Sequence, residues 1–165
     1  RLGKDHFYQL LKPLADLSTL SPDEFVDWGH EETFETAIGV GECAGVMIDL
    51  VSTLLLEAEE KLQWAVEAYE RKAYADSIYH SYSVFISSAK AMLLDKGINS
   101  STQVGIIRDF DEQFSGTAIL QDYSNFNELV LQINKNEPSA EFAGKYLEST
   151  VDFIKRIKEY KESLQ

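Results

Sequence analysis

The sequence predicts an all-α protein, an up-and-down bundle of about five helices preceded by an irregular N-terminal arm. Apolar residues recur at helical spacing from about residue 49 almost to the C-terminus. No pair of alternating apolar segments is joined by a hairpin turn signal. A length of 165 residues, 44% of them hydrophobic, fits one globular domain. We therefore divide the chain into an arm or linker of residues 1–48 and a bundle of residues 49–165.

The arm is predicted to contain only short helices. Pro13 interrupts an amphipathic segment near its start, because proline breaks a regular helix. Ser21 and Pro22 form a good helix start, and Glu24 completes a capping box. Glycines between residues 39 and 45 then interrupt a further helical turn. We therefore expect no long helix before about residue 49.

Two long amphipathic helices are predicted next, from about Asp49 to Arg71 and from Tyr74 to a glycine stop at Gly97. Their buried stripes are Val51, Leu54, Leu55, Ala58, Leu62, Ala65, Val66 and Tyr69 in the first, and Tyr74, Ile78, Tyr82, Phe85, Ile86, Ala89, Met92 and Leu93 in the second. Because almost no loop separates them, they must lie antiparallel as an αα-hairpin.

Three more helices are predicted in the C-terminal part. The third follows a cap at Ser101 or Thr102, the fourth precedes a break at residues 134–138, and the fifth begins near Pro138. Their buried faces are Val104, Ile107, Phe110 and Phe114; Phe126, Leu129, Val130 and Ile133; and Phe142, Ala143, Tyr146, Leu147, Thr150, Val151, Ile154 and Ile157.

No complete catalytic or metal site is visible in the sequence. His6, His30 and His80 are far apart and lack the spacing of metal ligands. Cys43 is the only cysteine and has no established base, so we interpret it as an inert thiol. The glycines at residues 39–45 depart from the G-x-G-x-x-G fingerprint, because the third comes one residue late. We therefore expect no catalytic residue, no metal and no cofactor in this segment.

Five residues are candidates for binding a ligand or a partner. Tyr79, His80 and Tyr82 belong to an aromatic stretch that fits either core packing with hydroxyls at the rim or a partner surface. Lys90 and Arg108 could hold the phosphates of a nucleotide.

The block from about Leu54 to Gln165 resembles the HEPN family of helical domains. The residues that carry the resemblance are 62–65 (LQWA), 74–82 (YADSIYHSY), 88–94 (SAKAMLL), Gly97, and Ala143, Lys145, Tyr146, Val151, Phe153 and Ile154 of the closing helix. The resemblance implies an HEPN-like helical bundle. It also implies a family that includes ribonuclease toxins, nucleotide-binding modules and catalytically silent interaction domains.

The ribonuclease members of that family carry an arginine followed four to six residues later by a histidine. In this chain Arg108 is followed by residues 109–114 without a histidine, so no evident pair could activate the ribose hydroxyl and steady the phosphate. We therefore expect that this segment is not an enzyme but a non-catalytic accessory or interaction domain. A nucleotide-binding HEPN module is the alternative, and an HEPN ribonuclease toxin is a second, disfavoured one.

The arm adds a second similarity. Residues 27–29, Phe34 and residues 39–45 are similar to the C-terminal extension of bacterial sulfite/nitrite reductase-type proteins that end in an HEPN-like domain. This implies an upstream reductase domain as a partner. The reductase itself would lie outside this segment, because one cysteine cannot hold a four-cysteine iron–sulfur cluster.

Composition limits the other partners. The net charge of −13 makes nucleic acid a poor partner, because affinity for phosphate backbones comes from Lys and Arg. No run of about 18 apolar residues is present, so we expect no membrane partner. A single cysteine suits the reducing cytoplasm. We expect a protein partner, a homodimer through the two long helices as in related domains, and a nucleotide as a further candidate ligand.

Overall fold

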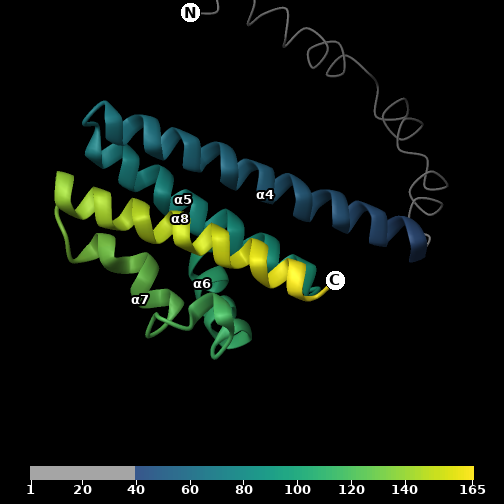
Figure 1. The fold of residues 1–165 in the computed structure, drawn as a ribbon. Helices are drawn as coiled ribbons and strands as arrows, with labels where there is room; N and C mark the ends of the chain where they lie inside the picture. Colours follow the sequence, from purple (N-terminus) through teal and green to yellow (C-terminus); the bar gives the residue numbers. More distant parts are fainter. Residues whose placement is uncertain (1–39) are drawn as a thin grey trace, which may run out of the picture. The chain divides into compact units, whose positions relative to one another are not determined.

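The computed structural model of the chain describes residues 40–165. These residues form five α-helices in an up-and-down bundle, without a β-strand, which confirms the predicted all-α class (Figure 1). The elements are α4 (Val40–Glu70), α5 (Tyr74–Asp95), α6 (Gln103–Phe114), the 3₁₀ turn η1 (Ala118–Leu120), α7 (Phe126–Val130), the 3₁₀ turn η2 (Leu131–Asn134) and α8 (Ala140–Ser163). The predicted helix start at Ser21 and the side chain of Cys43 lie outside the described part.

Helices α4 and α5 form the predicted hairpin through a turn at residues 71–73. Lys72 adopts a φ of 62° in this turn, the left-handed conformation that often ends a helix. The amide of Ala73 then donates to the carbonyl of Ala68 at 2.9 Å. Farther along, the Ser77 hydroxyl donates to the carbonyl of Ala65 at 2.8 Å. Small side chains at this contact let the two backbones approach closely and fix the register of the hairpin.

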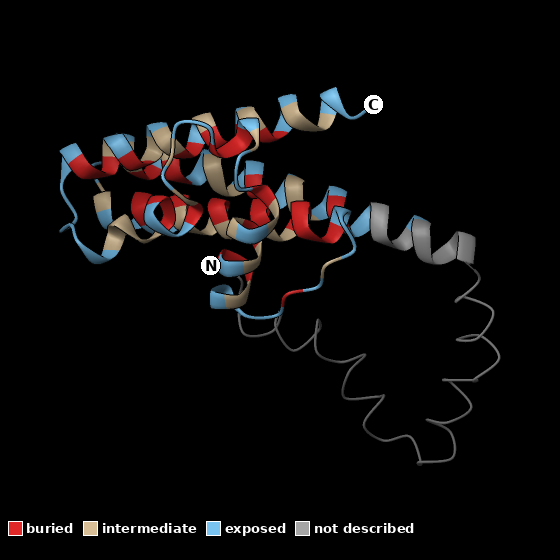
Figure 2. Ribbon diagram, turned by 90° about the horizontal axis from the view of Figure 1, so that it is seen from below, coloured by how far each residue is buried: buried red, intermediate tan, exposed pale blue. Residues whose placement is uncertain are grey.

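The core is an aromatic cluster to which four helices contribute phenylalanines. Phe85 of α5, Phe110 of α6, Phe126 of α7 and Phe153 of α8 are fully buried. The ring centroids of Phe110 and Phe126 lie 4.4 Å apart, and those of Phe126 and Phe153 lie 5.4 Å apart. Such pairs contribute about 0.5–1.5 kcal/mol beyond their burial. Figure 2 shows the buried residues on the facing sides of the helices.

Two helix boundaries differ from the prediction. Helix α4 begins at Val40, not near residue 49, and contains both Gly41 and Gly45. Each glycine costs only about 1 kcal/mol in a helix, and mostly apolar residues continue from Cys43 to Val51. The fourth helix is a short α7, and the chain continues as the 3₁₀ turn η2 through Asn134. The turn η1 was not predicted.

Two residues predicted to be in the core are exposed instead. Val104 is 77% exposed and Val151 is 46% exposed, whereas the omitted Phe153 is fully buried. The buried stripe of α8 runs through Tyr146, Thr150, Phe153 and Ile157, so the predicted stripe was too wide on the side of Val151.

Candidate functional site

A groove of about 400 Å³ lies between α5, α6 and the α7–η2 segment. Its size is that of a small-ligand site, which spans about 300–1,000 Å³. Helix α5 packs against α6, and α6 packs against α7, so the walls come from three distant parts of the sequence. The groove is mostly apolar with a few polar groups, and it is lined by Tyr82, Gln103, Val104, Ile107, Arg108, Asp111, Asn127 and Leu131. Two of the five candidate residues, Tyr82 and Arg108, are thus brought together.

The phenol of Tyr82 orients an amide at the α6 side of the groove. Its hydroxyl donates to Oε1 of Gln103 at 2.8 Å. Partial burial raises the pKa of Tyr82 above its ordinary value, so the phenol keeps its proton at neutral pH. With Oε1 engaged in this way, Gln103 keeps both N–H groups of its amide for a ligand.

Arg108 places a positive charge at the same groove. Its side chain is 73% exposed, and its Nε donates to Oδ1 of Asp109 at 3.0 Å. Asp109 also accepts a hydrogen bond from the Ser100 hydroxyl. The bond from Ser100 first, and that from Arg108 second, hold the pKa of Asp109 below its ordinary value. The charged carboxylate therefore restrains the guanidinium, whose remaining N–H groups can meet an anion.

Asp111 connects the groove wall to α7. Its carboxylate accepts hydrogen bonds from the amides of Phe126 and Asn127, the latter at 3.0 Å. The side chain of Asn125 caps the same turn by accepting from the amide of Glu128 at 2.7 Å. The first three amides of α7, which have no partner within the helix, are therefore all satisfied. Asp111 is occupied with this structural role.

Three candidate residues lie outside the groove. The ring of His80 contacts Trp64 of α4, with centroids 5.7 Å apart, and Tyr79, with centroids 5.6 Å apart. His80 precedes Tyr82 by two residues, so the two side chains point to different sides of α5. Lys90 is half-buried on α5 and does not line the groove.

Three polar groove residues were not predicted from the sequence. They are Gln103, Asp111 and Asn127. Gln103 and Asp111 lie four residues before and after the predicted core residue Ile107, so all three share one face of α6, and this spacing could have indicated the two polar residues. Asn127 carries no such signal, because the packing of α7 against α6 places it at the groove.

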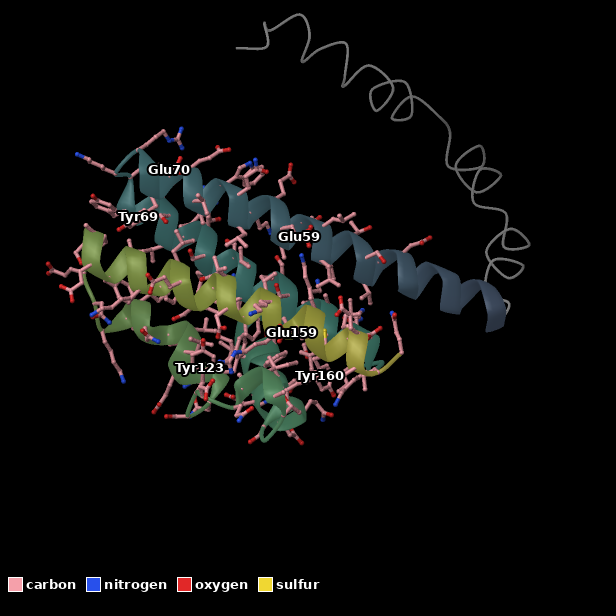
Figure 3. The ribbon with its side chains drawn as sticks, viewed as in Figure 1. Glu59, Tyr69, Glu70, Tyr123, Glu159 and Tyr160 are labelled. Atoms are coloured by element: carbon pink, nitrogen blue, oxygen red, sulfur yellow. The ribbon has the colours of Figure 1, made fainter. Side chains whose placement is uncertain are left out.

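A second groove, of about 480 Å³, lies between α4 and α8. Tyr69, labelled in Figure 3, leans on α8 at Gly144, where an added Cβ would come within 3.0 Å of its hydroxyl. The polar lining of this second groove includes the carboxylates of Glu148 and Asp152 and the ammonium of Lys155. We place the candidate site in the first groove, where a restrained arginine and an oriented amide offer hydrogen bonds to a ligand.

Two kinds of feature are absent from the part of the chain that the structure describes. No three His, Cys, Asp or Glu side chains gather there into a cluster able to hold a metal ion. None of its helices combines the length and apolar character needed to cross a membrane.

Comparison with known proteins points to one family. The family model described as the HEPN domain matches residues 51–160. The chain is also 32% identical over 72 residues to a protein of Methanocaldococcus jannaschii named "Putative toxin MJ0605". That alignment covers 44% of this chain and 54% of the relative, so the chain spans about half the length of the curated relative it matches. No solved structure matches the chain.

These matches confirm one prediction and correct another. The resemblance of the block from about Leu54 onward to HEPN domains is confirmed. The prediction that this segment is not an enzyme is contradicted by its similarity to a protein named as a toxin. That prediction depended on the missing histidine after Arg108, and one missing spacing excludes only one arrangement of a base and an arginine.

Proposed function

Because the chain belongs to the HEPN family, we propose that it is a toxin-type HEPN domain that binds RNA in the α5–α6–α7 groove and cleaves it. The similarity to a protein named as a toxin supports this class of function. The observation that carries the choice of site is the guanidinium of Arg108, which is exposed yet restrained beside a mostly apolar groove.

The groove has the two kinds of surface that a nucleotide requires. The planar guanidinium of Arg108 can hold a phosphate through two parallel hydrogen bonds. Its ion pair with Asp109 reduces the side-chain freedom that would be lost on binding. Val104, Ile107 and Leu131 supply apolar surface against which a base or ribose can pack.

This proposal departs from the expectation that nucleic acid is a poor partner. The net charge of −13 does oppose broad binding of a phosphate backbone. Recognition would then depend on short-range contacts in the groove, made to one or two nucleotides of a single strand. We therefore expect weak, salt-sensitive affinity for long RNA and a stronger dependence on Arg108 than on the overall charge.

We assign the groove residues to binding and charge stabilisation, not to proton transfer. The carboxylate of Asp111 already accepts two backbone amides, and the hydroxyl of Tyr82 donates its proton to Gln103. His80 lies beside Trp64, outside the groove. Arg108 would neutralise the charge that develops on the phosphate as the ribose 2′-hydroxyl attacks the phosphorus and the bond to the 5′-oxygen of the next nucleotide breaks. Solvent water would accept the proton of the 2′-hydroxyl and return one to the departing 5′-oxygen.

A module that binds a free nucleotide is the second candidate. The groove's size and its single arginine suit a mononucleotide. The two candidates differ in one observable, because only the RNA-directed toxin predicts that expression of the chain stops growth. A nucleotide-binding module predicts instead a rise in melting temperature with millimolar nucleotide.

Regulated expression of the full chain in a bacterial host, followed by growth curves and electrophoresis of total RNA, tests the proposal. Growth should slow and RNA should be cleaved. Arg108→Ala should reduce cleavage about tenfold or more, because a lost charged hydrogen bond costs about 1.5–3 kcal/mol. Arg71→Ala removes an exposed arginine outside the groove and should leave toxicity unchanged.

Two results would contradict the proposal in different ways. Harmless accumulation of folded, soluble protein at high level would exclude a toxin. Toxicity retained in full by Arg108→Ala would keep the toxin but move its site away from the groove.

Three expectations from the sequence stay predictions. They are the association with a sulfite/nitrite reductase-type protein, the homodimer and the cytoplasmic location. Light scattering on the full chain tests the dimer, because a monomer at high concentration would exclude it.

A further inference from the structure

Two polar residues of α6, Gln103 and Arg108, offer hydrogen-bond donors to the groove. Gln103 receives the proton of Tyr82 on Oε1, so its amide nitrogen is the group left to meet a ligand. Arg108 has donors only, and its ion pair with Asp109 holds part of the guanidinium while the side chain stays 73% exposed.

The principal acceptors of the groove are already engaged. Both carboxylate oxygens of Asp111 accept backbone amides at the start of α7. Oε1 of Gln103 accepts the hydroxyl of Tyr82. A carbonyl oxygen of a ligand turned toward α6 would therefore meet free N–H groups, whereas an amino group would have to share an acceptor that already takes a hydrogen bond.

The four bases differ in the groups that they would present to such a wall. On the edge that carries N7, guanine offers O6 and N7, and on the corresponding edge uracil offers O4, so both edges present acceptors. Adenine and cytosine each present an exocyclic amino group, which is a donor. Single-stranded RNA exposes these edges, since its bases can be turned out of the stack.

We propose that the groove prefers keto bases, binding uracil or guanine in place of adenine or cytosine. This inference rests on the proposed function, in which the groove binds RNA. Gln103 is the specificity-determining residue, and Tyr82 is the positioning residue that fixes which end of the amide faces the base. Arg108 holds the phosphate whichever base is present.

Titration of the ¹⁵N-labelled full chain with UMP, GMP, AMP and CMP, followed by NMR, tests the preference. The signals of the Gln103 side-chain amide and of the α6 backbone report on the groove directly. UMP and GMP should bind about tenfold more tightly than AMP and CMP, the discrimination that one matched pair of hydrogen bonds provides. Their addition should also shift the amide signals of Gln103.

Two variants separate the amide from the general binding of phosphate. Gln103→Glu keeps an acceptor for the hydroxyl of Tyr82 but removes the N–H groups, so it should abolish the preference for UMP and GMP. Tyr82→Phe removes the hydrogen bond that orients the Gln103 amide. It should reduce the difference in affinity between UMP or GMP and AMP or CMP, while all four nucleotides still bind. Gln63→Glu makes the same change of charge at an exposed position on α4 and should leave the preference intact.

The outcomes distinguish this inference from the proposed function. Equal affinities for the four nucleotides, with shifts confined to the groove, would overturn the base preference and leave the groove as an RNA site. Tighter binding of AMP or CMP would overturn it as well. Absence of any shift in the groove at millimolar nucleotide would overturn both.

Discussion

The aromatic core and the groove share helices α5, α6 and α7 but differ in how far their side chains are buried. In the core, Phe85, Phe110, Phe126 and Phe153 are fully buried and contact one another. In the groove, the side chain of Arg108 is 73% exposed although it precedes Phe110 by only two residues on α6. The side of α6 that carries Phe110 therefore fixes the fold, while Arg108 is largely free of packing constraints. A substitution of Arg108 can change binding without changing the bundle.

The largest expected effect lies in the core. Phe126→Ala should lower the free energy of unfolding by about 3–5 kcal/mol, because it removes a buried ring and leaves a cavity among three other phenylalanines. Val104→Ala, on the exposed face of α6, should change it by less than about 0.5 kcal/mol. Urea denaturation of both variants gives the two values. Similar losses would show that the groove face also supports the fold.

An intermediate loss of stability is expected at Asp111, which connects the groove wall to α7. Asp111→Asn leaves one backbone amide of α7 facing an amide nitrogen, so it should cost about 1–2 kcal/mol. Glu112→Gln, an exposed neighbour on α6, makes the same change of charge and should be near neutral. The measurement is again urea denaturation, combined with the NMR signals of the groove. A neutral Asp111→Asn would mean that the cap contributes nothing.

The smallest expected effect is a change of stability with pH, and it concerns Tyr123, which lies beside α8 (Figure 3). Burial, and then its hydrogen bond to Asp152, raises the pKa of Tyr123 to about 12. Because the folded pKa is raised, the stabilisation is complete below the unfolded pKa of about 10 and is lost as the pH rises toward 12.

Tyr123→Phe should remove this alkaline dependence. The stabilities of the two proteins, compared from pH 8 to pH 11, should converge as the pH rises. The tyrosinate absorbance should show one more late-titrating phenol in the natural sequence than in the variant, because burial raises the pKa of Tyr146 in both. Parallel stability curves would contradict the assigned pKa.

The sequence predicts the core better than the groove, and particular residues show why. Phe110 and Phe114 follow helical spacing on one helix, so local periodicity alone identifies them as buried. Val104 satisfies the same spacing but is exposed. The sequence does not show how far along α6 the neighbouring helices extend, so it could not predict this exposure. The groove requires Gln103, Asp111 and residues of α5 and α7 to meet, which only the tertiary packing decides.

The candidate residues show the same limit. Tyr82 and Arg108 were selected for their chemistry and share the groove, whereas His80, two residues from Tyr82, contacts α4. Sequence spacing assigns a side chain to a face of its own helix. It does not say which other helix that face will meet.

Helix α7 has only five residues, too few to persist without support from its surroundings. Its residue Phe126 gives its amide to Asp111 in the groove wall and its ring to the core. Occupancy of the groove and opening of α7 should therefore be thermodynamically linked through this one residue. A bound ligand would slow hydrogen exchange at the amides of Phe126 and Asn127, and the same exchange rates could serve as an internal gauge of whether the groove is filled.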